Sequence, residues 1–207
     1  MTALDIIYHF YPQDTALRRL LLLHSQCVAE KAIAILDQYE REFENLQEPG
    51  ITSLKVDRKL VFDGAMLHDI GICQCHAPGI LCSGTENYIC HGTIGAEMLR
   101  SYRSELEEEN ENISGIDWEA CARICERHTG AGLTAKNIID QQLPILPVRD
   151  LLPETPEEKL VCLADKFFSK SGDPSKEKDF DRVRRSIQKF GADSAERFDR
   201  LCALFAL

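Results

Sequence analysis

Residues 57–71 read DRKLVFDGAMLHDIG and predict a helix that ends at an adjacent histidine and aspartate. The apolar side chains of this stretch recur at helical spacing, which is typical of a helix buried in a core. Gly71 is expected to stop the helix, because glycine often follows the last helical turn. His68 and Asp69 are therefore predicted to lie at a helix end, where outward-pointing carbonyl groups favour a nearby cation.

A long helix is expected on the N-terminal side of this stretch. It should begin near Asp14 and bend around Leu23 and His24, and a polar turn containing Pro49 and Gly50 should close it. Apolar side chains recur along it at helical spacing: Val28, Ala32, Ile35, Leu36 and Tyr39.

The same periodicity continues on the C-terminal side. Further helices are predicted at about residues 91–107, 117–128 and 179–207, after Thr134, and from Thr155 and Pro156 onward. No alternating strand pattern interrupts them. The sequence therefore predicts an all-α fold, a single-domain helical bundle over residues 1–207 with a motif-bearing core at about 20–170.

The composition argues against several classes of partner. No apolar stretch approaches the roughly 20 residues that span a bilayer. The N-terminus lacks the features of a secretory signal, so a cytoplasmic protein that does not bind membranes is expected. The formal net charge of -10 repels polyanions, so nucleic acid is not an expected partner. The 9 cysteines are interpreted as reduced thiols, since the chain carries no visible secretory signal.

Six polar residues lie on or at the ends of the apolar helix stripes: His24, His68, Asp69, His91, His128 and Asp165. Each taken alone could also be a satisfied core or surface residue. A buried carboxylate is costly unless it is paired or binds a cation. Imidazole and carboxylate together favour divalent iron, manganese, cobalt, nickel or zinc. Shared metal ions would give each of the six buried polar side chains a partner. The two oxygens of Asp69 could bridge two ions.

The order of these residues resembles that of the HD-domain superfamily of metal-dependent phosphohydrolases. Its pattern is a histidine, an adjacent His-Asp pair and a distant aspartate, matched here by His24, His68, Asp69 and Asp165. The spelling HDIG at residues 68–71 resembles the HDIG subgroup. The segments ERHTGAG at 126–132 and EEKLVCLADK at 157–166 resemble a stand-alone group within it.

The resemblance implies a centre of two divalent metal ions. Iron or manganese is expected first, with zinc, cobalt or nickel as alternatives. The first ion would be held by His24, His68, Asp69 and Asp165. The second would be held by Asp69, His91 and His128.

The resemblance also implies hydrolysis of a phosphate monoester, diester or anhydride, in a small nucleotide-like or phosphorylated metabolite. Asp69 and His68 are the expected catalytic residues, because a metal-bound hydroxide there would attack phosphorus. Two alternatives stay open: a di-iron oxygenase of the same superfamily, and a non-catalytic ligand-binding or regulatory module. Cyclic-dinucleotide phosphodiesterases of this type usually carry a lysine shortly after the pair. Here Ile72 and Cys73 follow Gly71, which argues against that substrate.

Two basic residues are predicted to bind substrate. Arg149 lies in a proline-rich loop expected to face the helix of Asp165, and Lys166 adjoins that aspartate. A separate loop gathers cysteines and one histidine: Cys73, Cys75, His76, Cys82 and Cys90. We interpret it as a lid-like loop of partly buried, reduced thiols, with zinc binding or a reactive thiol as alternatives.

Overall fold

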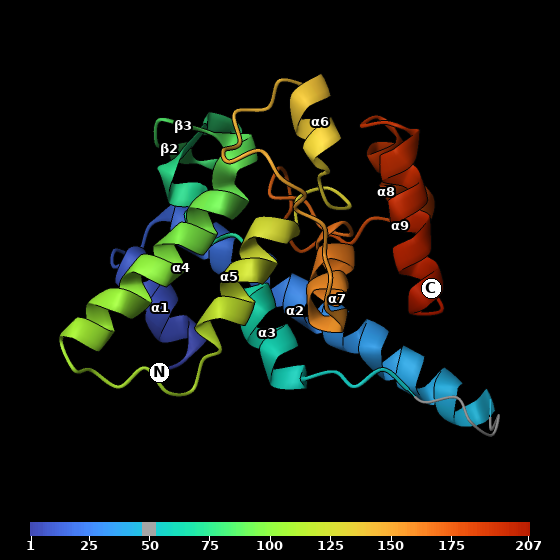
Figure 1. Cartoon of the computed structure of the whole chain (residues 1–207), viewed down its shortest axis with the longest axis horizontal. Helices are drawn as coiled ribbons and strands as arrows, with labels where there is room; N and C mark the ends of the chain where they lie inside the picture. The colour runs from blue at the N-terminus through green and yellow to red at the C-terminus, as the bar shows by residue number, and fades with distance from the viewer. Residues whose placement is uncertain (47–52) are drawn as a thin grey trace.

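The computed structural model describes residues 1–46 and 53–207, and within them the chain is mostly helical (Figure 1). The α-helices are α1 (Ala3–Phe10), α2 (Ala16–Leu46), α3 (Arg58–Leu67), α4 (His91–Glu108), α5 (Trp118–Arg127), α6 (Ala135–Asp140), α7 (Pro156–Asp165), α8 (Phe180–Gln188) and α9 (Ala192–Leu204). The predicted all-α, single-domain bundle is confirmed. In the described part of the chain, no helix combines the length and the apolar character needed to cross a membrane.

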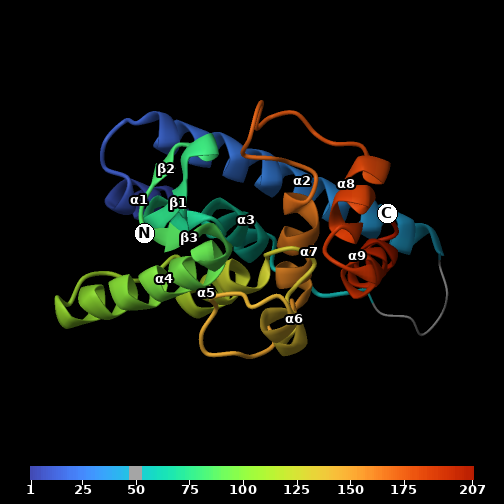
Figure 2. The same ribbon diagram turned by 90° about the horizontal axis from the view of Figure 1, so that it is seen from above.

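Helix α3 is at the centre of the bundle, where it packs against α2, α5 and α7. Its side chains Val61, Ala65 and Leu67 are buried. Gly64 lets α5 approach closely, because a Cβ at this position would lie 2.2 Å from Cδ1 of Ile124. Helix α4 packs along α5, and α8 and α9 form a pair beside α7, as two views show (Figures 1 and 2). The C-terminal end of α3 therefore lies where several helices meet.

Side-chain caps explain where several predicted helices begin. Asp57 caps α3, Thr134 caps α6 and Thr155 caps α7, each by accepting a hydrogen bond from an amide of the first turn. Amides there have no partner within the helix, so a polar side chain just before it is stabilising. The helix starts predicted near Asp57, Thr134 and Thr155 are confirmed.

Helix α2 corresponds to the long N-terminal helix. It continues through Leu23 and His24 without interruption, so the expected bend does not divide it. The polar turn predicted at Pro49 and Gly50 lies outside the described residues.

Gly71 does not end α3, contrary to the prediction. The helix ends at Leu67, and Gly71 lies inside a 3-10 helix, η1 (Ile70–Gln74), without a positive φ. A Cβ at position 71 would lie 2.3 Å from the carbonyl oxygen of His91 and 2.5 Å from the amide nitrogen of Gly95. Glycine is required because the backbone of α4 packs directly against it.

Two features of the fold were not predicted. Helix α1 begins at a capping box formed by Thr2 and Asp5, and it buries Ile6 and Ile7. The cysteine-rich segment contains two 3-10 helices, η2 (Pro78–Ile80) and η3 (Tyr88–Cys90), and a small sheet of β1 (Cys75–Ala77), β2 (Cys82–Ser83) and β3 (Glu86–Asn87). Strand β1 pairs antiparallel with β2 and parallel with β3. Strands this short have no room for an alternating pattern.

Candidate metal centre

The six candidate ligands come from separate segments and meet inside the bundle. Their relative exposures range from 0% to 8%. They are His24 within α2, His68 and Asp69 in the turn after α3, His91 at the start of α4, His128 directly after α5, and Asp165 at the end of α7. The packing of α2, α5 and α7 against α3, and of α4 against α5 and η1, brings these segments together.

Asp69 lies between two pairs of histidines. Its Oδ2 is 3.3 Å from Nε2 of His24 and 3.1 Å from Nε2 of His68. Its Oδ1 is 3.3 Å from Nε2 of His91 and 3.5 Å from Nε2 of His128. Each carboxylate oxygen therefore faces a different histidine pair.

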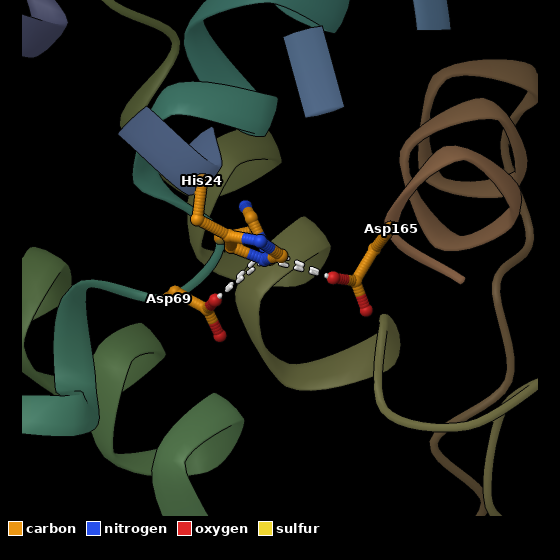
Figure 3. A group of neighbouring side chains, drawn as sticks. His24, Asp69 and Asp165 are labelled. Carbon is orange, nitrogen blue, oxygen red and sulfur yellow. Dashed lines mark hydrogen bonds and ion pairs between the residues drawn. The ribbon is translucent and has the colours of Figure 1, made fainter. Parts of the chain in front are cut away.

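Asp165 completes the first of two groups. Its Oδ1 is 3.1 Å from Nε2 of His24 and 3.5 Å from Nε2 of His68. Figure 3 shows His24 between the carboxylates of Asp69 and Asp165. Among the described residues, two groups bring ligand atoms within 4.8 Å of one another and could hold a metal ion: His24, His68, Asp69 and Asp165, and Asp69, His91 and His128.

Backbone carbonyl groups orient three of the histidines. Nδ1 of each donates a hydrogen bond to the carbonyl oxygen three residues earlier, at 2.6 Å for His68, 2.6 Å for His91 and 2.7 Å for His128. Because a carbonyl oxygen only accepts, Nδ1 carries the hydrogen and Nε2 is the atom that faces the centre. Hydrogen bonds of this kind orient metal-binding histidines and fix their tautomer.

Several polar atoms of the centre fit a bound cation. The Nε2 atoms of His91 and His128 are 3.0 Å apart, and neither carries a hydrogen in a neutral ring whose Nδ1 is protonated. Within residues 1–46 and 53–207, Nε2 of His68 and both oxygens of Asp69 are buried without a hydrogen-bond partner of suitable geometry. The Nε2 lone pairs of His91 and His128 repel each other at 3.0 Å unless a positive charge lies between them. The residues present therefore suit divalent ions.

Buried charges set the protonation states of the residues in the centre. Burial opposes ionisation of Asp69, but His68 and Lys170 outweigh it and hold the pKa of this carboxyl well below 3.8. Burial lowers the pKa of His68, but Asp69 and Asp165 prevail and raise it to about 9. Burial lowers the pKa of His128 to about 3, so this ring is neutral. The first group therefore holds a positive charge, either a proton on His68 or a metal ion that displaces it.

The HD domain family matches residues 8–169, a span that includes all six candidate ligands. The chain belongs to the HD domain family. HD domains bind divalent metal ions and form a superfamily of metal-dependent hydrolases. No solved structure matches the chain.

Three relatives extend the comparison. An uncharacterised protein from Methanocaldococcus jannaschii is 36% identical over 155 residues, which cover 75% of this chain and 74% of that protein. A tRNA (cytidine(56)-2'-O)-methyltransferase from Thermoplasma volcanium is 30% identical over 199 residues, 96% of this chain and 44% of that protein. A protein of the same name from Picrophilus torridus is 40% identical over 113 residues, 55% of this chain and 25% of that protein. The HD-domain chain thus spans less than half the length of either methyltransferase.

The two predicted substrate-binding residues have different surroundings in this HD domain. Nζ of Lys166 is 2.6 Å from Oδ2 of Asp165 and donates a hydrogen bond to the carbonyl oxygen of His128 at 3.1 Å. Arg149 forms an ion pair with Glu126 at 2.9 Å, and 43% of its side chain is exposed. The structure therefore brings Lys166 to the centre, whereas Arg149 is engaged by a carboxylate on α5.

Lys170 is a residue of the centre that sequence reasoning missed. Its Nζ lies 2.6 Å from Oδ2 of Asp69 and 6.0 Å from the ring centroid of Tyr88. The Tyr88 ring in turn stacks on His91, with 4.7 Å between ring centroids. Lys170 falls in a polar stretch after α7, where a lysine is ordinarily solvated, so the sequence carries no signal for it.

The cysteine-rich segment contributes to neither metal-capable group in the described part of the chain. Its cysteines are all free. Burial raises the pKa of Cys75 to about 12 and that of Cys82 to about 11, and it also raises the pKa values of Cys73 and Cys90. Such thiols are protonated at neutral pH and react slowly. His76 is exposed. The geometry supports the interpretation of these cysteines as reduced, partly buried thiols.

Proposed function

We propose that the chain is a metal-dependent phosphohydrolase of the HDIG subgroup, with two divalent metal ions held by six residues. The observation that carries this proposal is the position of Asp69, whose two oxygens face two different histidine pairs at 3.1–3.5 Å. A carboxylate in that position can bridge two cations, and sites with two cations suit the in-line displacement of phosphate esters.

The residues of the centre have separate tasks in this proposal. The first ion would be held by His24, His68, Asp69 and Asp165, and the second by Asp69, His91 and His128. Bound there, the two ions supply an activated water and neutralise charge on the phosphoryl oxygens. Asp69 and His68 would border the reacting atoms, while the carbonyl groups bound to Nδ1 keep the imidazole rings from turning. The mixed nitrogen and oxygen ligands suit iron or manganese, with zinc, cobalt and nickel also accommodated.

We propose a small nucleotide-like or phosphorylated metabolite, rather than intact tRNA, as the substrate. Two relatives are named for methylation of a tRNA ribose, but this chain covers only 25% and 44% of their lengths. Its net charge of -10 disfavours a long polyanion, whose binding depends on many cationic contacts. The names of both relatives refer to the ribose of a nucleotide. Nucleotides phosphorylated on the ribose therefore belong among the first substrates to test.

The test is an assay of phosphate release. Purified protein loaded separately with iron, manganese, cobalt or zinc is given a panel of phosphate monoesters, diesters and anhydrides, and a tRNA. We expect turnover of at least one small ester, loss of turnover in Asp69→Ala, and normal turnover in Asp181→Ala, which alters an exposed aspartate of α8.

Two results would contradict the proposal. Oxygen uptake coupled to substrate loss without phosphate release would indicate a di-iron oxygenase. Absence of turnover, together with absence of metal in protein purified without chelators, would indicate a non-catalytic module.

A further inference from the structure

Two ammonium groups lie inside the centre, one on each aspartate. Nζ of Lys166 is 2.6 Å from Oδ2 of Asp165, and Nζ of Lys170 is 2.6 Å from Oδ2 of Asp69. The side chains of Lys166 and Lys170 are only 10% and 11% exposed. Lysine is rarely buried to this extent unless it is paired, so each ammonium is held by its carboxylate.

The fold fixes both lysines beside the site. Lys166 follows the last residue of α7, and its ammonium also donates to the carbonyl oxygen of His128. Lys170 lies at the start of the segment between α7 and α8. Lys178 ties that segment to the end of α7: its amide donates to the carbonyl oxygen of Phe167 at 2.8 Å, and its ammonium donates to that of Lys166 at 3.0 Å.

The two lysines change the charge balance of the centre. Among the described residues, the carboxylates of the two metal-capable groups are Asp69 and Asp165, and each already has an ammonium partner. Divalent ions bound by the histidines and aspartates would therefore add positive charge that no side chain of these groups offsets. Positive charge in a buried site needs an anionic ligand, because the low dielectric strengthens attraction as well as repulsion.

We propose that Lys166 and Lys170 make this centre selective for phosphate monoesters, which carry two negative charges, over phosphate diesters, which carry one. This inference rests on the proposed phosphohydrolase function and narrows its substrate class. A monoester loses its second proton with a pKa of about 6, so it is a dianion at neutral pH. It offers oxygens to the metal ions and still has a charged oxygen for an ammonium group. Each ammonium has three N–H donors, of which its aspartate needs only one.

Ligand binding tests the proposal without catalysis. Calorimetric titration of the metal-loaded protein at about pH 8 compares inorganic phosphate, a dianion, with dimethyl phosphate, a monoanion. We expect phosphate to bind about tenfold or more tightly, the change that one charge-assisted hydrogen bond produces. Lys170→Met should lose about tenfold in phosphate affinity and much less for dimethyl phosphate. Lys170→Arg, which keeps the charge, should retain a preference for phosphate.

The matched control is Lys176→Met, which alters an exposed lysine of the same segment and should leave both affinities unchanged. Metal content is measured in every variant, so that loss of metal is not read as loss of the lysine contact.

Equal affinity of the wild-type protein for both anions would overturn the proposal, and this result needs no variant to fold. An unaltered preference in a metal-loaded Lys170→Met protein would overturn the role of Lys170. Absence of any ester hydrolysis despite a strong phosphate preference would instead contradict the proposed function alone.

Discussion

At the scale of single residues, Asp69 has the largest consequence, because both candidate groups share it. Asp69→Ala should abolish binding of both metal ions. His91→Ala should weaken chiefly the binding of the second ion, because His91 contacts Oδ1 of Asp69 and not Oδ2. Elemental analysis of the purified variants gives the number of ions per chain. Equal loss of a single ion in both variants would overturn the bridging role of Asp69.

Gly71 is the second residue whose replacement has a predictable effect. Gly71→Ala would place a Cβ 2.3 Å from the carbonyl oxygen of His91, so α4 or the turn carrying Asp69 must move. Overpacking of this kind costs about 1–3 kcal/mol of unfolding free energy. Gly79→Ala is the control, because a Cβ there meets nothing within 4 Å. Urea unfolding measures both variants, and equal midpoints would show that the backbones are not packed as described.

At the scale of elements, Arg197 joins α9 to the segment that follows His128. Its guanidinium donates to the carbonyl oxygens of Ala131 and Gly132, each at 3.2 Å, and to Oδ1 of Asn137 at 2.9 Å. Arg197→Ala should lower the unfolding free energy by about 2 kcal/mol, a common value for hydrogen bonds to a charged group. Arg200→Ala, an exposed arginine of α9, should change it little. Denaturant unfolding of the two variants compares them directly.

The contact between α6 and α9 also depends on pH. Hydrogen bonds from Asn137 and Arg197 lower the pKa of Asp193 to about 2, against an ordinary value of 3.8. Because the folded pKa is depressed, the contribution of this carboxylate is present above about pH 4 and is lost as pH falls toward 2. The stability difference between the wild type and Asp193→Asn should therefore shrink between about pH 5 and pH 3. Urea midpoints at the two pH values measure this, and a constant difference would contradict it.

At the scale of the whole molecule, metal binding should stabilise the folded chain as a unit. The ligands come from α2, α4, α7 and the turns after α3 and α5, so unfolding any of these separates them. A ligand present at 100 times its dissociation constant stabilises a folded protein by about 2.7 kcal/mol per site. Thermal unfolding with and without manganese should show a rise in midpoint that is absent in Asp69→Ala. An equal rise in that variant would locate the binding elsewhere.

Much of the architecture could be predicted from local sequence features. Helix starts can be predicted where a capping residue precedes the helix, because capping depends on residues adjacent in the chain. This holds for Asp57, Thr134 and Thr155. The strands β1, β2 and β3 could not be predicted, because two or three residues do not establish a period. The role of Gly71 was misjudged for a different reason: the atoms that require it belong to α4, distant in sequence.

For the centre, the six candidate ligands can be read from the sequence alone. Their types and order, and their places on helix stripes, are properties of the chain, and the polar side chains on apolar faces marked them as unusual. Tertiary packing sets the distances between Asp69 and the two histidine pairs, which the family resemblance already implies as two groups: α2, α5 and α7 pack against α3, and α4 packs against α5 and η1. It also decided the position of Lys170, whose polar surroundings in the sequence give no indication of burial against Asp69. Periodicity in the sequence indicates which face of a helix is buried, whereas contacts between segments depend on how the helices pack.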